Sequence, residues 1–169
     1  MSRRIHRLSM TFATALISLV VASSALAQSG ERGASFELFG ARVQPVDTDA
    51  DFHTESYGVR GGFRFTPVWA LEGAISRLNE DGDVWFGDLS AKAYAIHSDR
   101  FGVYALAGPG LFKVSGEDEE VMVHLGIGAE INLGGRAYVR PEVRGRWLAD
   151  ELNADEGLVD YSVGFGWRF

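Results

Sequence analysis

The chain has 169 residues, a formal net charge of −7, 21 glycines, four prolines and no cysteine. Its length suggests one domain, or two at most. Without cysteine there is no disulfide framework, thiol nucleophile or cysteine-ligated metal site, and the acidic balance argues against a nucleic-acid-binding protein, which needs clustered Lys and Arg.

Residues 1–27 have the pattern of a secretory signal peptide. Basic residues at the start precede an apolar stretch over 8–22, and small residues lead up to Ala27. This order predicts cleavage after Ala27. The alternative, an N-terminal membrane anchor, is disfavoured because the apolar run is short for a hydrocarbon core about 30 Å thick. We therefore expect one domain over residues 28–169.

Apolar and polar residues alternate through the rest of the chain, as strands with one apolar and one polar face do. In the last segment, Val163, Phe165 and Trp167 alternate with glycine and polar residues. Eight such segments follow one another at about 34–43, 56–65, 69–78, 84–96, 101–114, 120–133, 137–147 and 158–169. Each is long enough for the roughly 9–11 residues with which a tilted strand crosses a bilayer.

The connections between these segments alternate in length. Three short turns lie at 66–68, 97–100 and 134–136, and four mostly longer, acidic connections lie at 44–55, 79–83, 115–119 and 148–157. Short turns at one end and longer loops at the other are typical of a transmembrane β-barrel.

The acidic loops raise the question of metal binding. The segment Asp47–Asp51 has alternating carboxylates, but it lacks the glycine and the closing glutamate of an EF-hand. We expect solvated loops, no metal site and no cofactor. Cation-assisted contact with neighbouring lipopolysaccharide is the alternative.

Alternation alone leaves open which face of the sheet points outward. A soluble lipocalin-like barrel would turn its apolar face inward. Three features favour the inverse arrangement, with the apolar face outward. The polar face is rich in glycine and carries both charge signs, and aromatics lie near both ends of the apolar face. The last segment can also pair with the first. The charges expected to form a network in the lumen are Glu37, Arg60, Arg64, Glu72, Asp88, Lys92, Glu130, Arg140, Glu142, Arg144, Arg146, Asp160 and Arg168. The sequence thus predicts an all-β fold, an eight-stranded antiparallel transmembrane up-and-down β-barrel.

Three bases depart from the charged face. Arg42, Arg77 and Lys113 fall on the apolar face at the long-loop end, where a base costs little near the membrane interface. They are candidates for contact with lipopolysaccharide phosphates, and the other interpretation is snorkelling toward water without a specific lipid. The register of 101–114 stays open, because Tyr104, Leu106 and Phe112 form a rival apolar face.

The segment Tyr161–Phe169 resembles the C-terminal strand of Gram-negative outer-membrane proteins. Residues 28–169 as a whole resemble the small eight-stranded outer-membrane β-barrel family of the OmpA-transmembrane-domain, OmpX and opacity-protein type. The resemblance implies a monomer in the outer membrane, in contact with its lipid and lipopolysaccharide. It also implies recognition by the barrel-assembly machinery of the residues Tyr161, Val163, Phe165, Trp167 and Phe169.

The expected role is structural or surface interaction, through envelope integrity, adhesion or host contact. A narrow porin-like channel for small solutes is the first alternative, since the lumen ion pairs could switch partners. A lipid A-modifying enzyme is a weaker alternative. The mature chain keeps His53, His97 and His124, and no local motif places a serine within hydrogen-bond reach of any of them.

Overall fold

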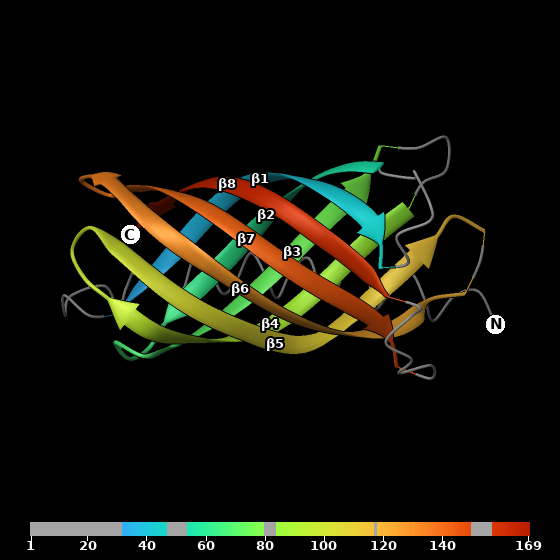
Figure 1. Ribbon diagram of the computed structural model, residues 1–169, viewed down its shortest axis with the longest axis horizontal. Helices are drawn as coiled ribbons and strands as arrows, with labels where there is room; N and C mark the ends of the chain where they lie inside the picture. Colours follow the sequence, from blue (N-terminus) through green and yellow to red (C-terminus); the bar gives the residue numbers. More distant parts are fainter. Residues whose placement is uncertain (1–31, 47–53, 80–83, 117, 150–156) are drawn as a thin grey trace.

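The computed structural model describes residues 32–46, 54–79, 84–116, 118–149 and 157–169, which form a closed barrel of eight antiparallel strands (Figure 1). The strands are β1 (Gly33–Pro45), β2 (Thr54–Arg64), β3 (Trp69–Leu78), β4 (Val84–His97), β5 (Phe101–Val114), β6 (Glu120–Gly134), β7 (Ala137–Leu148) and β8 (Leu158–Arg168). The predicted fold is confirmed, and the predicted strand ends differ from the observed ones by at most two residues. No helix within the described ranges is long and apolar enough to cross a membrane.

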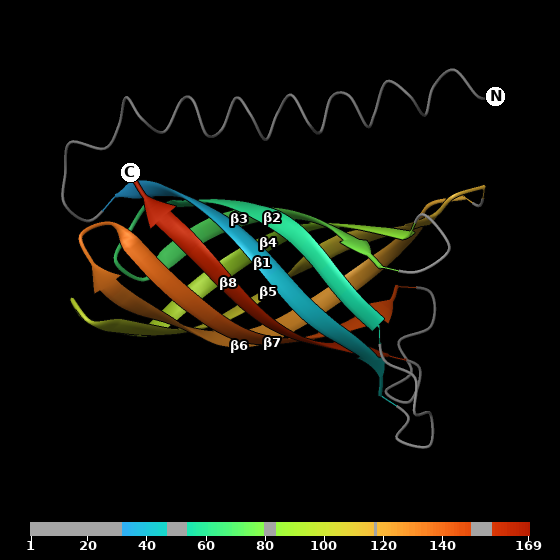
Figure 2. The same cartoon turned by 90° about the horizontal axis from the view of Figure 1, so that it is seen from above.

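The seam between β1 and β8 closes the barrel. Its register runs from Ser35 opposite Arg168 to Pro45 opposite Leu158. Figure 1 and Figure 2 both show β8 beside β1, with the C-terminus at the end where β1 begins. Because each strand edge has a partner, the backbone groups of the wall need no water to satisfy them.

The outer face of the barrel is apolar. Leu125 is 57% exposed, Ile127 65% and Val163 60%, and the buried charged residues lie on the inner face. Exposed aromatics lie at the short-turn end (Trp69, Phe101 and Trp167) and at the long-loop end (Tyr57, Trp85 and Tyr161). This arrangement is the inverse of a soluble barrel and fits a lipid band between two aromatic girdles.

Glycines make room inside the barrel for two large rings. Gly128 lies opposite Tyr104 on β5, and Gly166 lies opposite Tyr138 on β7. A Cβ at either glycine would collide with the facing phenol. Since eight strands enclose an interior only just wide enough for their side chains, this pairing of glycine with tyrosine lets the wall close around the rings.

The lumen is apolar at its long-loop end. Buried side chains from several strands pack together there, and partly buried ones pack against them: Val43, Leu78, Val84, Phe86 and Met122, with Phe112, Val114, Leu148 and Leu158. We term these nine side chains the apolar plug. It withdraws apolar surface from water within the barrel itself, on the face that the sequence pattern marks as polar.

Strand β5 is apolar on both faces because its inner face packs into two separate apolar clusters of the lumen, one of them the apolar plug. Tyr104 and Leu106 are buried and Phe112 packs into the apolar plug, whereas Val103 is exposed. The register that the sequence left open therefore turns Tyr104 and Leu106 inward. Pairing with β6 continues without a shift across Gly108–Gly110, so the outward parity is kept to the end of β5.

Candidate functional site

Charged side chains fill the middle of the lumen around Arg140 on β7. Its guanidinium contacts Glu72 on β3, and its Nε lies 3.0 Å from Glu37 Oε2 on β1. Its Nη2 lies 3.7 Å from Glu142 Oε2. Arg60 Nη1 on β2 binds the other oxygen of Glu37 at 2.9 Å. Strands from opposite parts of the sequence thus contribute to one group of charges.

The pairing continues toward the long-loop end. Arg144 Nη1 lies 2.8 Å from Asp88 Oδ2, and its Nη2 lies 2.8 Å from Glu142 Oε1. Arg146 bridges Asp88 Oδ1 and Asp160 Oδ2, each at 2.6 Å. Two bases therefore share Asp88, which ties β4 to β7 and, through Asp160, to β8.

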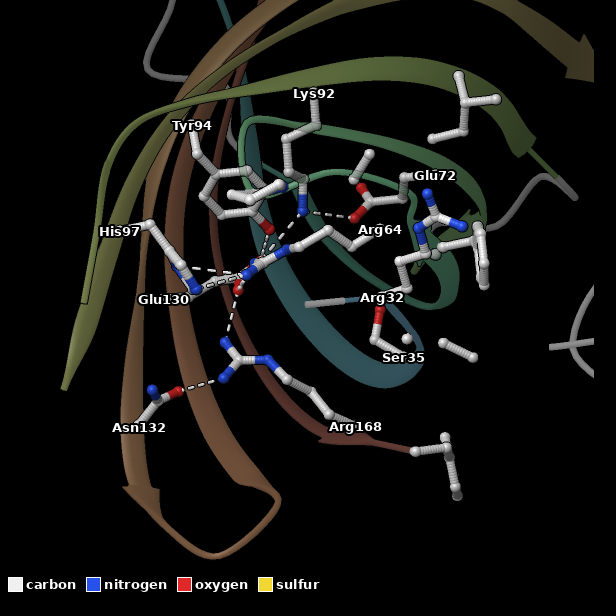
Figure 3. A pocket seen from close by; sticks show the side chains of 18 of the residues that line it. Arg32, Ser35, Arg64, Glu72, Lys92, Tyr94, His97, Glu130, Asn132 and Arg168 are labelled. Atoms are coloured by element: carbon white, nitrogen blue, oxygen red, sulfur yellow. Dashed lines mark hydrogen bonds and ion pairs between the residues drawn. The ribbon is translucent and has the colours of Figure 1, made fainter. Parts of the chain in front are cut away.

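At the short-turn end, three bases share one carboxylate. Glu130 Oε2 lies 3.2 Å from Arg64 Nη2 and 2.6 Å from Arg168 Nη2. Its Oε1 lies 3.3 Å from Lys92 Nζ and accepts a 2.6 Å hydrogen bond from Tyr94. Figure 3 shows these side chains converging on Glu130. Positive charge exceeds negative charge at this point of the lumen.

The structure places all thirteen charges expected in the lumen inside the barrel, and each forms at least one ion pair. Eleven are buried, and we term these the ionic layer. The side chains of Arg64 and Arg168 keep 14% and 31% exposure at the mouth. Removing one partner of a buried pair costs about 3–5 kcal/mol because the other charge stays uncompensated. Each member of the ionic layer is therefore costly to remove on its own.

A hollow of about 400 Å³, which we term the short-turn vestibule, opens at the short-turn end (Figure 3). Arg64, Tyr94, Glu130 and Arg168 line it, with the exposed His97 at its rim. The guanidinium carbon of Arg64 lies 4.0 Å from the ring centroid of Tyr94, and Arg64 Nη1 lies 2.9 Å from His97 Nε2. The sequence predicted a lumen filled with paired charges and gave no sign that one end stays hollow.

The three candidate bases for lipopolysaccharide contact lie on the outer face at the long-loop end. Arg77 on β3 lies opposite Tyr57 on β2 and Trp85 on β4, and Trp85 lies opposite Lys113 on β5. The guanidinium carbon of Arg77 is 5.6 Å from the Trp85 ring centroid. Aromatic and basic side chains thus alternate across four adjacent strands at one level of the barrel, and we term Tyr57, Arg77, Trp85 and Lys113, with Arg42, the outer belt.

Arg42 extends the outer belt to the barrel seam. It is exposed, and it lies opposite Glu55 on β2 and Tyr161 on β8. A second hollow, of about 420 Å³, lies beside it and is lined by Gly40 and Tyr161 among others. The missing side chain at Gly40 leaves this part of the outer wall recessed below Arg42.

Ser90, His124 and Asp88 meet inside the lumen. Ser90 Oγ lies 2.8 Å from His124 Nε2, and His124 Nδ1 lies 3.6 Å from Asp88 Oδ1. Only the pairing of strands brings together positions this far apart in sequence, so no local motif could have found them. Ser90 is 1% exposed and lines neither hollow, while Arg144 and Arg146 hold the Asp88 carboxylate. The residue types of a nucleophilic triad are present, but neither of the two hollows gives a substrate access to the serine.

The aromatic residues of β8 lie on the outer face. Every second residue of the strand is exposed, as is the residue that follows it: Tyr161, Val163, Phe165, Trp167 and Phe169. The rings of Phe165 and Trp167 meet edge to face, with centroids 4.5 Å apart. The residues expected to form the assembly signal therefore make one continuous row on the lipid-facing side.

Within the described ranges, no group of three or more His, Asp or Glu side chains could hold a metal ion. The segment Asp47–Asp51, His53 and the acidic residues of 80–83 and 150–156 lie outside those ranges. The expectation of solvated loops without a metal site therefore stays a prediction for them.

A family model described as the outer membrane protein beta-barrel domain matches residues 12–169. The chain belongs to this family. An outer-membrane β-barrel protein of this kind lies in the outer membrane of Gram-negative bacteria, with short turns toward the periplasm and longer loops toward the outside. The short-turn vestibule of this outer-membrane barrel thus opens to the periplasm, and its apolar plug faces the cell surface.

Solved structures share the fold of this outer-membrane barrel at low identity. The N-terminal β-barrel domain of Pseudomonas aeruginosa OprF is 16% identical, with a TM-score of 0.68 over 83% of this chain and 100% of that chain. Ail, the attachment invasion locus protein of Yersinia pestis, is 18% identical, with a TM-score of 0.58 over 84% and 100%. Neisserial surface protein A is 12% identical, with a TM-score of 0.60 over 82% and 97%. No curated protein sequence matches the chain significantly.

Proposed function

We propose that this outer-membrane barrel is a monomeric, non-enzymatic scaffold that holds acidic loops at the cell surface for structural or adhesive contact. The observation that carries the proposal is the double closure of the lumen. The ionic layer fills its middle, and the apolar plug fills its outer end. A channel needs a continuous path for water, and a packed apolar constriction breaks such a path by dewetting.

The loops supply the chemistry of the proposed surface contact. The connections at the long-loop end carry thirteen acids and no Lys or Arg: Asp47, Asp49, Asp51, Glu80, Asp81, Asp83, Glu117, Asp118, Glu119, Asp150, Glu151, Asp155 and Glu156. The related fold of Ail has been solved with sucrose octasulfate, a heparin analogue. We propose the opposite preference here, a cationic or cation-bridged partner, because acidic loops repel a sulfated polysaccharide.

Single-channel recording in planar bilayers tests the closed lumen. The folded wild-type protein is expected to give no conductance steps. A variant with Phe86→Ala, Met122→Ala and Arg140→Ala, which opens both the apolar plug and the ionic layer, is expected to give them. The matched control replaces Leu125, Ile127 and Val163 on the outer face with alanine, and it should stay silent.

A gated channel is the second candidate, and one observation favours it. Lys92 Nζ lies 2.9 Å from Glu72 and 3.3 Å from Glu130, and Arg144 lies within 3.6 Å of Glu72 as well as near Asp88. These bases have alternative partners at hand, so pairs could exchange. Discrete steps from the wild-type protein would establish this candidate and overturn the closed scaffold.

We further propose that the outer belt binds phosphates of lipopolysaccharide. Bases at the level of an aromatic girdle meet the phosphate-bearing headgroups of the outer leaflet. Arg42 stands above a recess of the wall, and Arg77 stands between two aromatic rings. Lys113 also pairs with Glu119 at 2.8 Å, and this carboxylate offsets part of its charge.

Native mass spectrometry with lipid A tests the outer belt. Replacing Arg42, Arg77 and Lys113 with glutamine is expected to lower lipid A retention roughly tenfold, as loss of charge-assisted contacts should. The matched control replaces three exposed arginines of the periplasmic end with glutamine, Arg32 before β1 and Arg100 and Arg136 on turns, and so removes the same charge. Equal retention by both variants, or equal binding of dephosphorylated lipid A by the wild type, would rule out phosphate recognition.

Two further parts of the proposal concern the route to the membrane. Removal of residues 1–27 as a signal peptide would deliver the chain to the periplasm. The exposed row on β8 from Tyr161 to Phe169 would then be read by the barrel-assembly machinery.

A further inference from the structure

The two ends of the lumen differ in what they let in. Nine apolar side chains close the outer end, whereas the inner end holds a hollow of about 400 Å³. A volume of this size exceeds that of a single water, about 30 Å³, by an order of magnitude. Small solutes of the periplasm can therefore enter the barrel from one side and reach the inner edge of the ionic layer.

The wall of the short-turn vestibule carries four bases, Arg32, Arg64, Lys92 and Arg168, against the three acids Glu72, Asp99 and Glu130. Arg64, Arg168 and Lys92 all approach the single carboxylate of Glu130. Of the other acids on this hollow, Glu72 is held by Lys92 and by Arg140, and Asp99 lies exposed on a turn of the rim. A second anion placed beside Glu130 would bring the charges of this cluster closer to balance.

Both mouth guanidiniums are held in place with donors to spare. Arg64 rests on the Tyr94 ring and contacts His97 and Glu130; Arg168 donates to Asn132 Oδ1 at 2.6 Å and to Glu130 Oε2 at 2.6 Å. A guanidinium has five N–H groups in a planar fork that suits the oxygens of carboxylates and phosphates. The contacts described for each arginine use only part of that fork, and both side chains stay partly exposed toward the hollow.

We propose that the short-turn vestibule is a binding site for a small oxyanion, a phosphate or carboxylate from the periplasm, held by Arg64 and Arg168. Burial of the site in a low-dielectric wall strengthens the attraction between guanidinium and oxyanion. Glu130 acts as the internal competitor, since it occupies the same guanidiniums when the ligand is absent. The site depends on the inner end alone, so it would exist in either a closed scaffold or a gated channel.

Titration of the full mature protein in lipid nanodiscs tests this site. Inorganic phosphate and citrate are added separately at constant ionic strength, with chloride as reference, and calorimetry and NMR signals of the arginine side chains report binding. At least one of the two is expected to bind saturably and to shift Arg64 and Arg168. Saturation by phosphate alone or citrate alone identifies the ligand chemistry. Absence of saturation by both, or shifts equal to those of chloride, overturns the proposal.

Variants separate binding from a purely structural role. Arg64→Gln with Arg168→Gln is expected to weaken binding roughly tenfold or more, while the matched pair Arg100→Gln and Arg136→Gln on the exposed turns leaves it unchanged. Glu130→Gln removes the competitor and is expected to tighten binding. Heat-modifiable migration on gels verifies that each variant folds, and Arg64→Lys with Arg168→Lys replaces the glutamine pair if that pair does not. A folded Glu130→Gln protein that binds no more tightly contradicts the proposal.

Discussion

At the scale of single residues, the interior depends on charges that cannot be removed one at a time. Arg140 contacts carboxylates on β1, β3 and β7, and it is 1% exposed. Loss of its guanidinium would leave the buried carboxylates of Glu72 and Glu37 short of positive charge, with Lys92 and Arg60 as remaining partners. The free-energy cost of removing such a residue comes mainly from the buried charge that is left uncompensated.

We therefore expect Arg140→Met to lower the free energy of unfolding by about 3–5 kcal/mol. The double variant Arg140→Met with Glu72→Gln should lose less unfolding free energy than Arg140→Met alone, because the uncompensated Glu72 carboxylate is gone. Urea titration in detergent, followed by the folded and unfolded gel bands, measures both. Arg136→Met, on an exposed turn, is the control. A double variant that is less stable than the single one would show that the uncompensated charge is not the cause.

The parity of each residue could be predicted from the sequence, but its partners could not. Glu130 and Arg64 both fall on the polar face in the alternation, and that much needs only the period of a strand. That Glu130 gathers Arg64, Lys92 and Arg168, or that Ser90 meets His124, depends on how β2, β4, β6 and β8 are staggered around the barrel. Stagger is set by the closure of all eight strands together.

At the scale of elements, β8 combines two tasks. Its backbone closes the barrel against β1, and its outer face carries the exposed row that ends at Phe169. The backbone N–H of Phe169 donates to Ala34 O at 2.9 Å, and its side chain lies half exposed. Its ring therefore contributes little to packing within the barrel, which leaves recognition during assembly as its proposed use.

Deletion of Phe169 is expected to lower the amount of folded protein in the outer membrane several-fold while leaving refolding of the purified chain in detergent nearly unchanged. The heat-modifiable band in membrane fractions and in refolding reactions measures the two quantities. Phe65→Ala, an exposed aromatic at the same end of the barrel, is the matched control. Equal loss in membranes and in detergent would assign Phe169 to folding rather than to recognition.

Strand β5 marks the limit of pattern-based prediction for elements. Two-faced apolarity at Tyr104, Leu106 and Val103 made both registers consistent with the alternation. The interior of this barrel is polar in its middle but apolar at the long-loop end, where Phe112 of β5 packs against Phe86 and Met122 in the apolar plug. The alternation of a strand can be read from its own residues, whereas the polarity of the interior that it faces depends on the side chains of all the strands.

At the scale of the whole molecule, the barrel is asymmetric along its axis. Fold, strand order and orientation of the faces follow from alternation, loop lengths and the pairing of the last segment with the first. The apolar plug and the short-turn vestibule do not, because both result from side chains of many strands meeting at one depth. The proposed functions divide along the same axis, with acidic loops outside and an oxyanion site inside.

The pairing of the first strand with the last also determines when the barrel can close during folding. β1 and β8 are the first and the last strand of the barrel, so their pairing spans a larger sequence separation than any other pair of neighbouring strands. Such maximal sequence separation makes completion slow and leaves unpaired strand edges exposed in the meantime. A chain truncated before β8 would consequently leave the free edge of β1 unpaired, and its barrel could not close.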